Sequence, residues 1–301
     1  MSREQPLTSP KAINDVVERY AVTEAQAHLL VAKTAVAKLV ARVTDDEMFV
    51  LKGGTLLHHV HGSPRVSLAD IDYADGRKEQ SADIAAVKDA IRAEHDLGFQ
   101  LDVDAGAWNQ KGGLISGEEI PVILTTDASG DHPVNISVAV RQGEVIDMEV
   151  VEFQPVGLVD GTVFRVQAVS LEEAAAEKII AWCIKGKPKH FHDLAYIARK
   201  QPGVEHTRVA EMITVKFYAE KEAEETREEY AQRKLNEPAD LRRYWSRESR
   251  MNGLRKKWPN ELGSELILDL KEIERQSESL ANFDVAYKLA TECFGGVFDR
   301  L

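Results

Sequence analysis

The chain has 301 residues, of which 44% are hydrophobic and 29% are charged, and its two cysteines are Cys183 and Cys293. This composition excludes a disordered or collagen-like chain, and two cysteines exclude a disulfide framework or a four-thiolate zinc site. No stretch approaches the ~18 consecutive apolar residues of a membrane span, so we expect a cytoplasmic protein without a membrane partner. With 38 basic and 50 acidic residues the net charge is −12, which excludes a general nucleic-acid coat.

The first half of the chain predicts two helices followed by strands. Helices are expected over 12–22 and 23–43, and Thr23 with Gln26 fits a capping box for the second one. The apolar run at 48–51 ends in Lys52-Gly53-Gly54-Thr55, which is typical of a buried strand that turns into a helix. A helix is also expected over 80–95. Further strands are predicted around Ile71 and at 99–103, 120–126, 134–140, 145–153 and 163–166.

From Ser170 onward the pattern is helical. Ser170 and Glu173 fit a second capping box. Helices are predicted over 170–184, 190–199, 204–220, 223–235, 241–257 and 266–294. The shift in composition near residue 168 predicts two domains, a strand-rich core with N-terminal helices at 1–168 and a helical C-terminal domain at 169–301.

Asp70 and Asp72 are the first candidates for chemistry. Residues two apart on a strand point to the same face, so both carboxylates would project together while Ile71 enters the core. Such a pair suits a divalent cation such as Mg²⁺, which prefers carboxylate oxygens and substrate phosphates. The alternative is an exposed strand end without a ligand.

The segment Lys52-Gly53-Gly54-Thr55 lies between the predicted strand and helix. Its glycines allow backbone N–H groups to approach an anion at the start of a helix, where phosphates bind. A tight turn without a ligand fits equally well, and the spacing of a Walker A loop is absent.

Lys178 lies on a predicted helix that is apolar on nearly all sides. A buried lysine is costly unless an anion pairs with it. Asp193 or a bound triphosphate could be that anion, or the Lys178 side chain could extend to the surface.

The order of these segments resembles a known family. The motifs are FVLKGGT at 49–55, RVS at 65–67, DID at 70–72, EKI at 177–179 and HDL at 192–194. They resemble those of the AbiEii/AbiGii nucleotidyltransferase toxins, which include the MenT-type toxins of the DNA polymerase β-like superfamily. The resemblance implies an α+β fold with a minimal nucleotidyltransferase core of mixed sheet and flanking helices. An all-helical C-terminal region that carries the lysine and final aspartate motifs would follow.

The resemblance also implies roles for individual residues. Asp70 and Asp72 would be the ligands of Mg²⁺ or Mn²⁺, Lys178 would contact the triphosphate of an NTP, and Asp193 would act in catalysis or nucleotide positioning. Nucleotide binding is implied for Lys52, Gly53, Gly54, Thr55 and Arg65.

Two features depart from the family pattern. Ser67 corresponds to a regulatory phosphorylation site of some relatives, but one extra residue separates Arg65 from Asp70 here. The superfamily also has a third carboxylate on a later strand. Asn135 is nearest to its place, and the possible substitutes are Asp102, Asp104 and Asp147.

Segment 241–258 is the strongest candidate for RNA contact. Its basic residues are Arg242, Arg243, Arg247, Arg250, Arg255, Lys256 and Lys257. They alternate with Tyr244, Trp245 and Trp258, whose rings could stack on unpaired bases while the cations track phosphates. A helix that packs its aromatic rings inward and solvates its arginines is an equal alternative.

His58, His59 and His61 crowd the helix that follows the two glycines. Since no cysteine is nearby, we expect histidines at the surface or behind the site rather than a zinc site.

The resulting hypothesis is a toxin that transfers a nucleoside monophosphate from an NTP to the 3′ end of tRNA, releases pyrophosphate and blocks translation. A cognate antitoxin protein would be its partner. The alternatives are a catalytically weak module that binds a nucleotide or the antitoxin, and an NTP-dependent transferase that acts on protein.

Overall fold

A computed structural model gives the fold, and it describes residues 9–43, 49–66, 70–75, 89, 92–93, 100–101, 115–123, 134–142, 146–159, 161–222, 230–245, 247–265, 267–268, 280 and 282–301. The chain divides into two compact units, Met1–Ala168 with Ile267–Leu270, and Val169–Leu266 with Lys271–Leu301. Among the helices described, none has the length and apolarity to cross a membrane.

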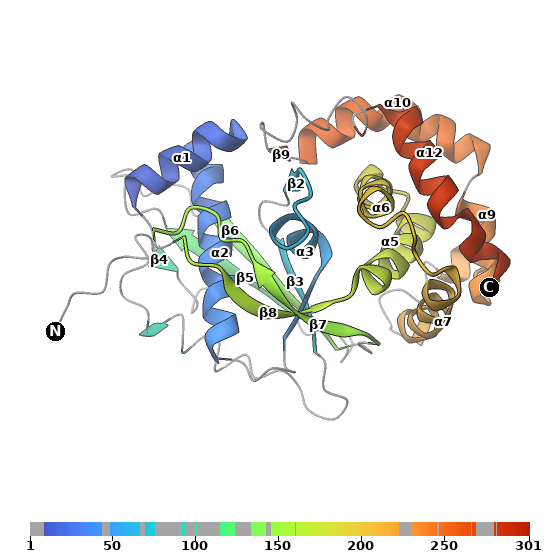
Figure 1. The fold of residues 1–301 in the computed structure, drawn as a ribbon, viewed down its shortest axis with the longest axis horizontal. Helices are drawn as coiled ribbons and strands as arrows, with labels where there is room; N and C mark the ends of the chain where they lie inside the picture. The colour runs from blue at the N-terminus through green and yellow to red at the C-terminus, as the bar shows by residue number, and fades with distance from the viewer. Residues whose placement is uncertain are drawn as a thin grey trace. The chain divides into compact units, whose positions relative to one another are not determined.

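A mixed seven-stranded sheet forms the centre of the first unit (Figure 1). Its strands run in the order β4-β5-β6-β3-β1-β8-β7. β3 pairs in parallel with β6 and β1 with β8, whereas β1–β3, β5–β6 and β4–β5 are antiparallel. The strands are β1 (Val50–Lys52), β3 (Asp70–Asp75), β4 (Gln100–Leu101), β5 (Ile115–Ile123), β6 (Val134–Gln142), β7 (Met148–Phe153) and β8 (Phe164–Val169).

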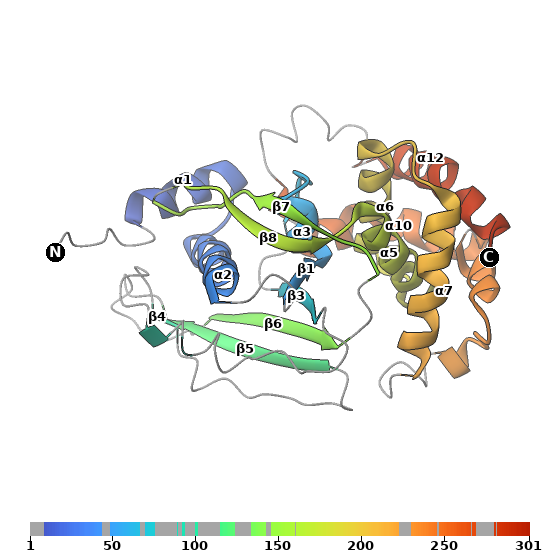
Figure 2. The same ribbon diagram turned by 60° about the horizontal axis from the view of Figure 1, so that its bottom comes forward.

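Three helices accompany the sheet: α1 (Pro10–Tyr20), α2 (Glu24–Val43) and α3 (Gly53–His59). The predicted capping box of α2 is confirmed, because Thr23 N–H donates to Gln26 Oε1 and Gln26 N–H donates to Thr23 Oγ1. Figure 2 shows α2 nearly end-on, with β5 and β6 on one side and β7 and β8 on the other. Apolar side chains such as Leu30, Val31 and Val36 are fully buried there.

Two short strands lie outside this sheet, and one of them stands where the start of a helix was predicted. β2 (Arg65–Val66) pairs antiparallel with β9 (Ile267–Leu268). The helix expected over 266–294 is therefore wrong at its start, and the described helix there is α12 (Phe283–Phe294). The short apolar run at 266–268 suited a helix or a strand, and pairing with a distant segment decided the outcome.

The second unit is helical in the part that the structure describes. Its centre is Phe191, whose ring contacts Trp182, Trp245, Trp258 and Tyr287 at centroid distances of 5.0–6.4 Å. Its helices are α5 (Leu171–Lys185), α6 (Pro188–Lys200), α7 (His206–Glu222), η1 (Pro238–Leu241), α9 (Arg242–Trp245), α10 (Glu248–Glu265), α12 and η2 (Gly295–Asp299).

The start of α5 agrees with its predicted capping box, since Ser170 Oγ accepts from Glu173 N–H. The single helix predicted over 241–257 is wrong, because η1, α9 and α10 share that segment. The helices predicted over 80–95 and 223–235 lie largely outside the described residues. The mixed sheet with flanking helices and the helical region after it confirm the predicted α+β fold.

Candidate functional site

The turn between β1 and α3 lies directly against β3. Gly53 has a φ of 70°, a left-handed conformation that glycine tolerates best. A Cβ atom at Gly53 would collide with Oδ2 of Asp72, so only glycine leaves room for that carboxylate. Thr55 Oγ1 donates a 2.9 Å hydrogen bond to the carbonyl of Asp70. The predicted strand, turn and helix are present, and the turn is fixed against the acidic strand.

Asp70 and Asp72 share one face of β3. Asp70 is exposed and Asp72 half-buried, whereas Ile71 between them is completely buried. The antiparallel register places Lys52 of β1 opposite Asp72, and such opposed residues face the same side of a sheet with Cβ atoms ~5 Å apart. The carboxylate pair therefore has an ammonium group beside it on the next strand.

The strand on the other side of β3 places no carboxylate beside this pair. In β6, Ser137 is opposite Asp70 and Ala139 is opposite Asp72. Asn135 lies two residues before Ser137 in β6. Asp147 precedes β7, which β8 and β1 separate from β3. Asp102 and Asp104 lie outside the described residues.

The carboxylate pair fits a hard divalent cation whose coordination is completed by substrate. Mg²⁺ is commonly held by one or two carboxylates and by substrate phosphates rather than by an all-protein cage. Asp70 and Asp72 supply two carboxylates at an accessible face, and no three Asp, Glu, His or Cys side chains converge within the described ranges. Mg²⁺ or Mn²⁺ would suit this set of ligands.

Lys33 belongs to the same group of charges but was missed from the sequence. It lies on α2, which contacts β3 and β6, and its side chain is fully buried. Burial lowers the pKa of Lys33 from 10.5 to about 7, although the charges of Asp70 and Asp72 oppose this shift. Helical periodicity offers no signal for such a residue, because a long lysine side chain usually reaches solvent.

Arg65 is also buried, in β2, and its charge acts on Lys33 as well. Its backbone N–H donates to Ser63 Oγ at 3.3 Å. Lys52 and Arg65 balance the two carboxylates, and Lys33 adds a third positive charge when it is protonated, so this region suits an anionic ligand such as a phosphate. Ser67 lies outside the described residues.

Two of the three histidines support this region from inside. His58 Nδ1 donates to the Ser63 carbonyl at 2.6 Å, and its Nε2 accepts from the Tyr20 hydroxyl at 3.2 Å. His59 Nδ1 donates to the Gln154 carbonyl at 2.9 Å. Burial lowers the pKa of His59 well below 6.5, so its ring is neutral. Both side chains are buried, so of the two expected placements, at the surface or behind the site, the surface placement is wrong for this pair.

Lys178 and Asp193 form a buried ion pair in the second unit. Lys178 Nζ lies 2.7 Å from Asp193 Oδ2, and the side chains are 11% and 0% exposed. Asp193 is therefore the anion that balances Lys178 here, and the alternative of a lysine extended into solvent is wrong. The pair joins α5 to α6.

A second buried cation, Lys216 of α7, pairs with two acidic residues of α5. Lys216 of α7 lies 2.6 Å from Glu173 Oε1 and 2.9 Å from Glu177 Oε1 of α5. Although burial alone would lower its pKa, the charges of Glu177 and Glu173 raise it above 10.5. These contacts fix α5, and with it Lys178, against α7.

The aromatic residues of the basic segment point inward. Trp245 and Trp258 are buried around Phe191, and the Tyr244 hydroxyl donates to the carbonyl of Arg233 at 2.7 Å. Of the two alternatives for this segment, inward packing is correct for both tryptophans, which are not available to stack on bases.

Arg250 is packed against an aromatic ring and a backbone carbonyl of α5. Its guanidinium lies 4.6 Å from the ring centroid of Trp182, and Nη1 donates to the Cys183 carbonyl at 2.8 Å. A Cβ atom at Gly186, which ends α5 with a φ of 66°, would collide with this guanidinium. Arg250 thereby links α10 to the end of α5.

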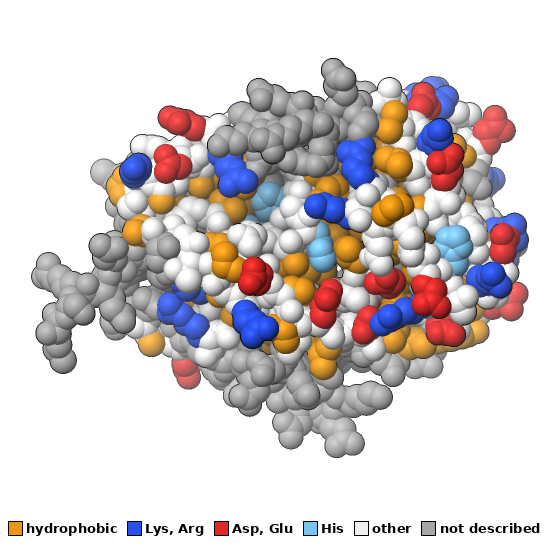
Figure 3. All heavy atoms as spheres, in the orientation of Figure 1, with side chains coloured by type: hydrophobic (Ala, Val, Ile, Leu, Met, Phe, Trp, Pro, Cys, Tyr) orange, Lys and Arg blue, Asp and Glu red, His pale blue; other side chains and the backbone are white. Residues whose placement is uncertain are grey.

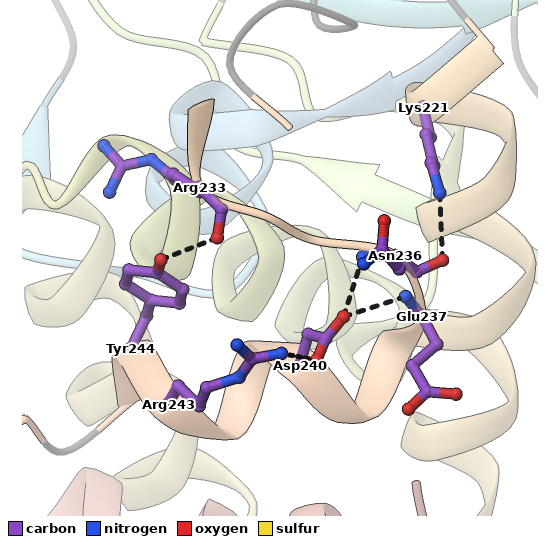
Figure 4. A network of polar contacts seen from close by, with 7 residues as sticks. All are labelled: Lys221, Arg233, Asn236, Glu237, Asp240, Arg243 and Tyr244. Carbon is purple, nitrogen blue, oxygen red and sulfur yellow. Dashed lines mark hydrogen bonds and ion pairs between the residues drawn. The ribbon is translucent and has the colours of Figure 1, made fainter. Parts of the chain in front are cut away.

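Several cations of this segment line a small surface hollow of about 380 Å³, called the arginine hollow below. Its lining residues are Arg242, Arg243, Tyr244 and Arg247. Polar contacts hold its wall in place (Figure 4). Asp240 accepts from the N–H groups of Asn236 and Glu237 and pairs with Arg243. Arg242 lies 3.1 Å from Asp299, and guanidinium groups such as these suit phosphate oxygens.

One face of the molecule carries charges of both signs. On the face seen in Figure 3, Lys and Arg side chains alternate with Asp and Glu. Lys256 and Lys257 are exposed on α10, and Arg255 pairs with Asp284 at 2.5 Å. An RNA contact would therefore be local, which agrees with the net charge of −12.

Comparisons with known proteins agree with this fold and these motifs. The family model described as nucleotidyl transferase AbiEii toxin, type IV TA system, matches residues 36–262, and no curated protein matches the chain. MenT4, a nucleotidyltransferase toxin from Mycobacterium tuberculosis H37Rv, has a similar structure with a TM-score of 0.53 and 18% identity, over 69% of this chain and 71% of that one. JHP933 from Helicobacter pylori is similar with a TM-score of 0.52 and 14% identity, over 98% and 94%.

Proposed function

Because the chain belongs to the AbiEii nucleotidyltransferase toxin family, we propose that it transfers a nucleoside monophosphate from an NTP to the 3′ end of tRNA. The transfer would block translation in the cytoplasm, and a cognate antitoxin would counteract it. One observation carries the proposal, namely the accessible Asp70–Asp72 pair fixed against the turn at Gly53, with Lys52 opposite.

The reaction is a displacement at the α-phosphorus. The 3′ oxygen of the RNA forms a bond to this phosphorus, the bond to the bridging β-phosphate oxygen breaks, pyrophosphate leaves, and the hydroxyl proton passes to solvent or to a base. Asp70 and Asp72 would hold Mg²⁺ or Mn²⁺, which supplies charge neutralisation at the phosphates and the attacking oxygen. Lys52, Thr55 and Arg65 would bind and orient the nucleotide.

Lys178 and Asp193 would act as the family resemblance implies. In this proposal Lys178 contacts the triphosphate, and Asp193, whose Oδ2 lies 2.7 Å from Lys178 Nζ, orients its ammonium group.

The RNA would be held by the exposed cations of the second unit. The arginine hollow is the first candidate, followed by Lys256 and Lys257 on α10. Arginine pairs well with phosphate oxygens through two parallel hydrogen bonds. Arg250 is engaged with Trp182 and Cys183, so we assign it to support of this surface rather than to RNA.

Incubation of the protein with each labelled NTP, Mg²⁺ and total tRNA tests the reaction class and the acceptor together. We expect label at the 3′ end of tRNA, and Asp70→Asn should abolish it while the circular dichroism spectrum is unchanged. Label on protein would favour the protein-modifying alternative. Absence of pyrophosphate release with every NTP would favour a binding module and refute the proposal.

A further inference from the structure

The turn between α5 and α6 carries two lysines that the proposed function does not use. Lys185 is the last residue of α5, Lys187 directly precedes α6, and Gly186 lies between them with a φ of 66°. Both lysine side chains are exposed, and neither forms an ion pair within the described part of the chain. This segment, called the lysine turn below, therefore presents two positive charges to solvent.

A single guanidinium group connects the lysine turn with the arginine hollow. A Cβ atom at Gly186 would collide with the guanidinium of Arg250, so this group lies directly against the backbone of the turn. Nη1 of Arg250 donates to the Cys183 carbonyl at 2.8 Å and to the Tyr244 carbonyl at 3.3 Å. Because Tyr244 lines the arginine hollow, the hollow and the lysine turn are neighbours in the second unit.

The charge that remains unbalanced in the hollow lies next to the same guanidinium. Arg242 and Arg243 pair with carboxylates of their own unit. Arg247 is exposed and pairs with none of the described carboxylates. Its backbone carbonyl accepts a 2.9 Å hydrogen bond from the N–H of Arg250. Arg250 thus contacts both the residue that carries the excess charge of the hollow and the lysine turn.

We propose that the lysine turn and the arginine hollow form one binding surface for the phosphate backbone of RNA, with Lys185, Lys187 and Arg247 as its unbalanced cations. The inference rests on the proposed function, because it takes RNA as the acceptor and the hollow as a contact with it. An RNA strand carries a charge at every nucleotide, so it can contact the turn and the hollow together. The N-terminus of α6, which begins at the turn, adds positive potential there.

Salt-dependent binding of total tRNA, labelled with fluorescein at its 5′ end and followed by fluorescence anisotropy without NTP, tests this surface. Each phosphate contact contributes about 0.9 to the slope of log affinity against log salt. Replacing both Lys185 and Lys187 with glutamine should reduce this slope by about 2 and weaken binding about thirtyfold at about 150 mM salt. Each single variant should reduce the slope by about 1. An unchanged slope in the double variant, or no salt-dependent binding by the wild type, overturns the proposal.

Lys200→Gln is the matched control for these variants. Lys200 is also an exposed lysine, but it ends α6, about 18 Å along the helix from its first residue. We expect this variant to keep the wild-type slope, and a loss equal to that of Lys187→Gln would overturn the proposal. Lys185→Arg with Lys187→Arg keeps both charges and should bind as the wild type does. Displacement of tRNA by polyglutamate at equal charge concentration would instead favour an acidic protein partner and overturn the proposal.

The binding titration contains no NTP, so its outcome is independent of the transfer assay. A wild-type protein that transfers no nucleotide, while the double lysine variant shows the reduced slope, would refute the proposed function and support the binding surface. A wild-type protein that labels tRNA, while the double variant keeps the wild-type slope, would refute only the role of the lysine turn.

Discussion

Replacement of Lys33 by methionine should change how the stability of the first unit depends on pH. Burial holds the pKa of Lys33 at about 7 in the folded protein, against an ordinary value of 10.5. Below pH 7 the lysine is protonated in both states, and the full cost of burying its charge is present. Between pH 7 and 10.5 the unfolded chain binds a proton that the folded chain lacks, so the free energy of unfolding rises with pH.

The size of this effect follows from the two pKa values. The full difference between 10.5 and about 7 corresponds to about 5 kcal/mol of cost at low pH. About 2 kcal/mol of that cost is relieved between pH 7 and pH 9, because the folded state has lost its proton and the unfolded state keeps it. Lys33→Met has no proton to lose, so this contribution disappears.

Urea unfolding followed by circular dichroism at pH 7 and pH 9 measures the effect. The wild type should gain about 2 kcal/mol more than Lys33→Met between these two pH values. Other titrating groups contribute equally to both proteins, and Lys38→Met controls for the loss of a lysine from α2. If the wild type and Lys33→Met show the same pH dependence, Lys33 does not titrate near pH 7 and the reasoning from its burial is refuted.

Three further predictions concern the turn, the ion pair and the hollow. Gly53→Ala should reduce tRNA labelling by about a hundredfold, because the added Cβ displaces Asp72. The control Gly62→Ala, also at a positive φ, should lower stability with little loss of labelling. Equal losses of labelling in the two variants would contradict this prediction. Asp193→Ala should lower the free energy of unfolding by about 3 kcal/mol in urea, because it leaves Lys178 buried without its partner, and adding Lys178→Met should restore much of it. Replacing the three arginines of the arginine hollow with glutamine should weaken tRNA binding, measured by fluorescence anisotropy, and reduce the slope of log affinity against log salt by up to about 3. The control Arg208→Gln should change neither the affinity nor the slope. An unchanged slope in the triple variant would exclude phosphate contacts at the hollow.

Local patterns in the sequence predicted the parts of the fold that depend on neighbouring residues. The capping box at Thr23 formed as expected, and at Ser170 the side chain caps the Glu173 amide, since each bond needs only a side chain and an amide three residues away. Alternation in Asp70-Ile71-Asp72 correctly placed two carboxylates on one face and Ile71 in the core. These features do not depend on which segment packs against them.

Features that depend on distant segments were missed or left open. The strand at 267–268 exists because β2 pairs with it, which no local window contains. Lys33 looked like an ordinary helical lysine, because its burial depends on β3 and β6 covering α2. Likewise, the direction of Trp245 and Trp258 is decided by Phe191 of α6, far earlier in the chain. Tertiary packing therefore decided each of these outcomes.

The pairing of β2 with β9 has a consequence for the order of folding during synthesis. Arg65 and Val66 reach their partners only after the ribosome has added Ile267 and Leu268, which lie far later in the sequence. Closing a loop of this length is slow compared with local helix formation. The segment that enters the acidic strand thus acquires its final structure late. A nascent toxin would remain incomplete beside its proposed metal site until the ribosome has added the residues of β9.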